Sequence, residues 1–121
     1  MIAVLNLFDL IPGREQDYGE YLKRVQPLLQ RFEARVLFYG LTRLVYAGNC
    51  TQQYFGLVVY PCWEKLRQLS HDIEFKRIRP LRDRSTTNYV LTVVEELPVT
   101  DLSALLIKAS STSTRADVCW K

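Results

Sequence analysis

The segment IAVLNLFDLI, residues 2–11, decides the fold, because it is apolar on both sides when it is read as an extended strand. One side of the strand carries Ile2, Val4, Phe8 and Leu10. The other side carries Ala3, Leu5, Leu7 and Ile11. A strand that faced water on one side would alternate between apolar and polar residues. We therefore expect a central strand whose two faces are both covered.

A helical pattern begins after Pro12 and Gly13, and it extends to residue 32. Pro27 lies inside it, and an internal proline costs about 3 kcal/mol. Burial of four apolar side chains at roughly 1.5 to 3 kcal/mol each outweighs that cost, so we predict one bent helix. Its predicted buried stripe consists of Tyr18, Leu22, Val25, Leu29 and Phe32.

Three further strands are predicted from β-branched and aromatic runs. The first runs from 35 to 39 and continues over 42–47, with Gly40 as a bulge or bend. The others cover 54–60 and 88–95. A helix from 62 to about 71 and a third helix with Asp72 as its N-cap lie between them. The predicted inner residues of the two helices are Trp63, Leu66, Leu69 or Ser70, Phe75, Ile78 and Leu81.

The order βαββαβ predicts an α+β protein with a ferredoxin-like arrangement, a four-stranded antiparallel sheet with its helices on one face. The other face of the sheet is also apolar, so we expect a second copy to cover it in a homodimer. Residues 1–96 form the predicted domain. Residues 97–121 form a predicted tail or arm, with a short helix capped by Asp101 and a Ser-Thr run at 110–114.

Composition narrows the function classes. The chain has 121 residues, which suits one domain, and its net charge of +3 is small for a dedicated nucleic-acid binder. Its cysteines, Cys50, Cys62 and Cys119, match no metal or redox spacing and predict no disulfide framework. No apolar run reaches the roughly 20 residues of a membrane span. We expect a soluble protein of the reducing cytoplasm that binds no membrane.

Several motifs together resemble a bacterial family of unknown function. They are the segment 21–29 with its internal proline, the segment 59–64 (VYPCWE), Glu74-Phe75 and Leu81-Arg82-Asp83. That family belongs to the dimeric ferredoxin-like α/β-barrel superfamily, and the resemblance covers residues 1 to about 96. It implies a homodimer with a small-molecule cleft between helices and sheet. Members of the superfamily include cofactor-free monooxygenases, haem enzymes and isomerases, so the fold does not fix an activity.

His71 is the only histidine, and it lies where two predicted helices meet. It is the natural candidate for a catalytic acid or base, since no other side chain titrates near neutral pH unperturbed. The structural interpretation, a polar cap or an interface residue, is the more frequent role of a single histidine. A metal site of the usual type would need a second histidine, which this sequence does not contain.

Arg82 with Asp83 is the strongest polar pair, and an arginine fork beside a cleft could hold a carboxylate or phosphate. A helix-terminal ion pair is the structural alternative, which we favour. The further candidates for ligand binding are Arg35, Arg43, Tyr39 and Trp63, together with Tyr54 and Tyr60.

A small-molecule protein is therefore the first hypothesis, with an assembly or interaction protein without chemistry as the alternative. If a reaction occurs, we expect cofactor-independent proton transfer or oxygenation on a small organic acid or aromatic compound, because no phosphate loop or metal cluster is present. RNA binding ranks last. The segments 2–7 and 55–60 echo the motifs of an RNA recognition module, but Ala3 and Leu57 stand where base-stacking aromatics belong.

Overall fold

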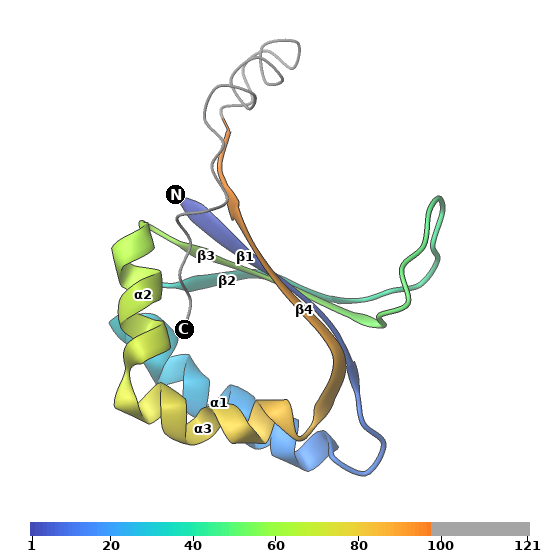
Figure 1. Cartoon of the computed structure of the whole chain (residues 1–121), viewed down its shortest axis with the longest axis horizontal. Coiled ribbons are helices and arrows are strands. Elements are labelled where there is room, and N and C mark those ends of the chain that lie inside the picture. Colours follow the sequence, from blue (N-terminus) through green and yellow to red (C-terminus); the bar gives the residue numbers. More distant parts are fainter. Residues whose placement is uncertain (98–121) are drawn as a thin grey trace.

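The computed structural model describes residues 1–97, which form one antiparallel sheet with three helices against one of its faces (Figure 1). The predicted tail from residue 98 onward, including the helix at Asp101 and the Ser-Thr run, lies outside the described residues. The elements are β1 (Ile2–Leu10), α1 (Glu15–Arg31), β2 (Arg35–Leu41), β3 (Tyr54–Tyr60), α2 (Trp63–His71), α3 (Ile73–Asp83) and β4 (Thr86–Glu95). None of the described helices is long and apolar enough to cross a membrane.

β1 occupies an inner position of the sheet, whose strand order is β2-β3-β1-β4. Val4 pairs with Val58 of β3 on one side and with Val93 of β4 on the other. Residues of β1 are alternately buried and half-buried, with Phe8 on the inner face and Leu5 on the outer one. The predicted α+β, ferredoxin-like fold with a doubly apolar central strand is thus confirmed.

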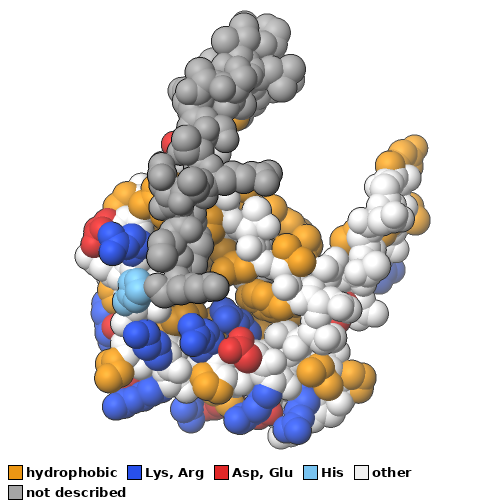
Figure 2. All heavy atoms as spheres, in the orientation of Figure 1, with side chains coloured by type: hydrophobic (Ala, Val, Ile, Leu, Met, Phe, Trp, Pro, Cys, Tyr) orange, Lys and Arg blue, Asp and Glu red, His pale blue; other side chains and the backbone are white. Residues whose placement is uncertain are grey.

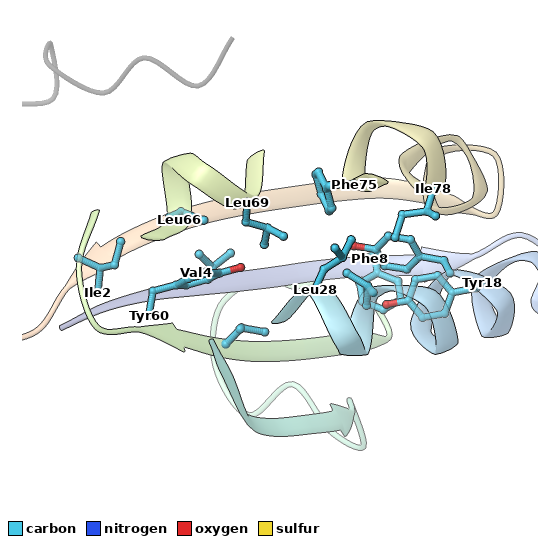
Figure 3. Packing of buried hydrophobic residues seen from close by; sticks show 13 residues of the cluster. Ile2, Val4, Phe8, Tyr18, Leu28, Tyr60, Leu66, Leu69, Phe75 and Ile78 are labelled. Carbon is cyan, nitrogen blue, oxygen red and sulfur yellow. The ribbon is translucent and has the colours of Figure 1, made fainter. Parts of the chain in front are cut away.

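Phe8 is the centre of the core, with 1% of its surface exposed. Its ring stacks on Tyr54 at a centroid distance of 5.5 Å and on Tyr89 at 5.8 Å, and it contacts Tyr18 of α1 at 5.1 Å. Figure 3 shows Phe8 and Tyr18 at one end of this layer, and Leu66 and Leu69 of α2 over the sheet farther along. Helices and sheet are therefore held together by aromatic packing at one end and aliphatic packing at the other.

α1 runs unbroken through Pro27, as predicted. Its buried line is, however, displaced from the predicted stripe. Tyr21 and Leu28 are buried, whereas Leu22 and Leu29 are only partly buried. The reason is that α1 packs against α3, while Tyr18 of α1 contacts Phe8 and Tyr39 of the sheet, so two neighbours set its buried face.

β2 is shorter than predicted, since it ends at Leu41 and the segment 42–47 is not part of a strand. The register shift also falls between Val36 and Phe38, not at Gly40. Gly40 serves a different purpose: a Cβ there would lie 2.6 Å from the Phe38 ring, which needs that space. The segment 42–53 projects beyond the sheet as a hairpin (Figure 1), where no second layer supports pairing.

Trp63 is a further correction, because it is 39% exposed and does not share the inner face of α2. That face consists of Leu66 and Leu69, both buried against the sheet side. Trp63 is the first residue of α2, so it stands at the helix end and not above the core.

Asp72 caps α3 as predicted, and its Oδ1 accepts hydrogen bonds from the backbone N–H of Glu74 at 2.8 Å and of Phe75 at 3.2 Å. We predict that Asp72→Ala lowers the free energy of unfolding by about 1 kcal/mol, because those amides lose their acceptor. Urea unfolding followed by circular dichroism measures the effect. Asp72→Asn keeps an acceptor oxygen and is the control. Equal losses in the two variants would contradict a capping role.

Candidate functional site

A cavity of about 390 Å³ lies between the inner face of the sheet and the helices. Val4 and Asn6 of β1 form part of its floor, while Val25 of α1 and Phe75 of α3 form part of its helical wall. Lys and Arg side chains gather on the helical side of the molecule (Figure 2). The volume falls within the range of small-molecule sites, and apolar and aromatic groups dominate the lining.

Phenol groups are the most frequent polar groups in the cavity. Five of the seven tyrosines of the chain line it, and we call them the cavity tyrosines: Tyr18, Tyr21, Tyr39, Tyr60 and Tyr89. The hydroxyls of Tyr18 and Tyr39 share a hydrogen bond of 2.6 Å. The Tyr89 hydroxyl donates to Asn6 Oδ1 at 2.5 Å. Three of the five hydroxyls, those of Tyr18, Tyr39 and Tyr89, are thus paired with partners in the cavity wall itself.

Sheet register brings these groups together. Gly56 of β3 lies between Asn6 of β1 and Tyr39 of β2 in the ladder, so all three belong to the inner face. A Cβ at Gly56 would lie 3.1 Å from the Tyr39 ring. The absence of a side chain at this position therefore lets Tyr39 lie flat across the sheet and reach Tyr18 on α1.

Arg82 of α3 brings a positive charge to the cavity, and its side chain is only 16% exposed. The guanidinium carbon lies 4.9 Å from the centroid of the Tyr89 ring, 5.9 Å from that of Tyr21 and 6.0 Å from that of Phe75. Such distances are those of cation–π contacts. Asp83 holds one edge of the guanidinium at 3.2 Å, and the Asp83 side chain is itself 57% exposed.

Charges are unbalanced within the cavity. Arg79 and Arg82 line it, whereas no aspartate or glutamate does among the described residues. The carboxylate of Asp83 lies outside the lining, where solvent screens it. The arrangement favours an anion over a neutral or cationic guest.

Burial raises the pKa of every one of the cavity tyrosines above the ordinary value of 10.0. Neighbouring phenols add to this rise for Tyr18 and Tyr60. The charge of Arg82 works in the opposite direction on Tyr21, Tyr39 and Tyr89, because it stabilises a phenolate. All five therefore stay protonated at neutral pH and act as hydrogen-bond donors or acceptors, not as bases.

The structure brings together only some of the residues that the sequence singled out. Arg82, Tyr39 and Tyr60 line the cavity. His71 does not, since it is exposed at the end of α2.

Four other candidates also lie outside the lining. Arg35 is exposed at the start of β2, and Arg43 lies in the projecting hairpin. Trp63 stands in the first turn of α2, and Tyr54 is stacked on Phe8 in the core. Each is excluded by its place in the fold: Arg43 lies beyond the sheet, and the ring of Tyr54 packs on Phe8 instead of bordering the cavity.

Sequence reasoning missed Asn6, Tyr18, Tyr21 and Tyr89 as site residues. Asn6 gave a usable signal, because it is the one polar residue on the otherwise apolar inner face of β1. The tyrosines gave none, since aromatic residues at helical or strand spacing are usually core. Within residues 1–97, no group of three or more His, Cys, Asp and Glu side chains is placed to hold a metal ion.

The comparisons with known proteins identify a family for this chain and several solved structures of similar fold. A family model described as a domain of unknown function, DUF1330, matches residues 8–97. The chain belongs to this family. No curated protein matches the DUF1330 chain.

Solved structures resemble the DUF1330 chain in fold. A protein of unknown function from Rhodopseudomonas palustris, RPA0582, has a TM-score of 0.72 at 19% identity, covering 80% of this chain and 82% of its own. A dimeric ferredoxin-like protein of unknown function from Jannaschia sp. CCS1 has 0.64 at 14% identity, with coverages of 78% and 98%. SnoaB, a cofactor-independent oxygenase from Streptomyces nogalater, has 0.58 at 11% identity, with coverages of 83% and 97%.

The buried phenols predict an alkaline limit to stability. The pKa values of these phenols are raised in the folded state, so the neutral phenols stabilise the fold. Their contribution to folding stability is complete below pH 10.0, the ordinary tyrosine pKa, and it is lost as the pH rises beyond that value. We expect most tyrosinate absorbance to develop together with the loss of circular dichroism signal. Full ionisation of all tyrosines near pH 10 with an intact fold would contradict the burial of these hydroxyls.

Proposed function

We propose that this DUF1330 protein binds a small organic anion with an apolar or aromatic body in the cavity between helices and sheet. The observation that carries the proposal is Arg82, a largely buried guanidinium in a cavity without any acidic lining among the described residues. Aromatic rings of Tyr21, Tyr89 and Phe75 surround the charge and offer contact area to a flat ligand.

Geometry at Arg82 leaves room for a ligand. Asp83 Oδ1 contacts the guanidinium Nε and Nη2. A guanidinium has five N–H donors, so one oxygen on one edge cannot satisfy all of them. A ligand carboxylate would accept from the remaining donors in charge-assisted hydrogen bonds, which are among the strongest in proteins.

The affinity test compares Arg82→Met with Arg77→Met. Arg77 lies on the same helix, pairs with Glu74 and is absent from the cavity lining. The Arg77→Met substitution therefore removes an equal charge away from the cavity. We expect benzoate to raise the melting temperature of the wild type and of the Arg77 variant. Loss of Arg82 removes the shift, because a charge-assisted pair is worth about 1.5 to 3 kcal/mol, or roughly 10-fold to 150-fold in Kd. Equal shifts in both variants would remove Arg82 as the anchor.

Catalysis is a separate question from binding. No histidine, aspartate or glutamate lines the cavity among the described residues, so His71 as its base remains a prediction without support from the cavity. Oxygenase activity belongs to SnoaB, whose likeness to this chain is one of fold. We therefore propose a binding protein first.

A homodimer is the second part of the proposal. The outer face of the sheet carries Leu5 opposite Leu57, with Phe38 and Val94 on the same face at 55% and 40% exposure. Apolar surface of this extent calls for a partner, and a second copy placed by a two-fold axis supplies the same surface. The Jannaschia neighbour is described as dimeric, which supports this assignment. The alternative function, assembly without a ligand, uses the same face.

The dimer prediction is tested with Leu5→Lys, which places a charge at the middle of the outer face. We expect light scattering after size exclusion to show a dimer for the wild type and a monomer for the variant. Gln30→Lys, at an exposed position of α1 on the helical side, adds the same positive charge and is the control. A wild-type monomer at micromolar concentration would overturn the proposal.

The cytoplasmic location also remains a proposal. Cys50 and Cys62, the two cysteines within residues 1–97, are both exposed and form no disulfide with each other, which suits a reducing compartment.

A further inference from the structure

Proton counting at the Tyr18–Tyr39 pair points to the kind of anion that the cavity holds. Two phenols carry two hydroxyl protons, and only one of them can lie in the 2.6 Å hydrogen bond between their oxygens. The accepting hydroxyl keeps a proton that it can donate elsewhere. Tyr39 is the more open member of the pair, at 42% exposure against 7% for Tyr18. Its hydroxyl is therefore the better placed to donate to a guest while Tyr18 donates to Tyr39.

We infer that the cavity is an oxyanion site, which takes phenols and enols as their anions, with Arg82 as counter-charge and the Tyr18–Tyr39 pair as hydrogen-bond donor. This inference rests on the proposed function and names its ligand class. Hydrogen-bonded phenols and a guanidinium line the same cavity, and such groups are preorganised donors for a negatively charged oxygen. The aromatic walls match the flat body that phenolates and conjugated enolates share.

Electrostatics in the cavity support the ionised form. The titratable groups that face it are the cavity tyrosines from α1, β2, β3 and β4, and the two arginines of α3. The Arg82 guanidinium lies 4.9 Å from the Tyr89 ring and 5.9 Å from the Tyr21 ring, and its charge opposes the effect of burial on the pKa of Tyr21, Tyr39 and Tyr89. A ligand oxygen at the same place would experience the same field.

The proton balance is simple. A phenol that binds as its anion releases one proton to the buffer, and no covalent bond other than O–H is broken. None of the described lining residues is a histidine or a carboxylate that could retain this proton. The ligand therefore ionises before or on entry, and binding strengthens as the pH rises toward the ligand's own pKa.

The experiment uses 4-nitrophenol, whose anion is coloured and whose ionisation falls near neutral pH. Spectrophotometric titration of the dye with excess wild-type protein gives the pKa of the bound dye. We expect this pKa to lie about 1 to 3 units below that of the free dye, the range for an opposite charge at contact distance. Tyr39→Phe keeps the ring and removes the hydroxyl, and Arg82→Gln removes the charge. Both should reduce the shift, with the larger loss for Arg82.

Matched controls separate the site from general effects. Arg77→Gln removes a charge from α3 outside the cavity, and Tyr46→Phe removes a hydroxyl from a tyrosine that is 94% exposed. Both should leave the shift unchanged. A bound dye with an unshifted or raised pKa would overturn the oxyanion inference, even if benzoate binds and the proposed function stands. Failure of both benzoate and the dye to bind would overturn the proposed function as well.

Discussion

β1 has to be covered on both faces, and the rest of the molecule follows from that constraint. Its inner face presents Phe8, which is 1% exposed, and its outer face presents half-buried Leu5 and Leu7. Helices α1, α2 and α3 supply the inner cover. Water is a poor cover for the outer face, so the same strand that organises the protomer also favours a second copy.

The side chains packed between the helices and the sheet leave a cavity next to the aromatic residues. Phe8, Tyr54 and Tyr89 stack closely at one end, whereas α2 contributes the aliphatic side chains of Leu66 and Leu69 farther along. Between these regions remains a space of about 390 Å³ bordered by phenols. A layer built only of aliphatic side chains could fill such a space, but it would offer a ligand no polar contact.

Arg82 connects packing with electrostatics. It lies over three aromatic rings, and its ionic partner Asp83 remains largely in solvent. A charge in this position is costly unless something compensates for it, and the aromatic faces and Asp83 do so in part. An anionic ligand would complete the compensation. The phenols around it, kept neutral by burial, would then serve as donors and not as competing anions.

The sequence by itself determined the βαββαβ order, the helix through Pro27 and the Asp72 cap, because periodicity and capping act within a few residues of the chain. It also indicated Arg82 and Tyr39 as site residues, although not their surroundings. Only the tertiary structure decided that Asn6, Tyr18 and Tyr89 join them while His71 stays outside, since those contacts join residues up to 83 positions apart and depend on strand register and helix placement. Side-chain direction at an element's end, as at Trp63 and His71, is likewise set by the neighbouring layers and not by local spacing.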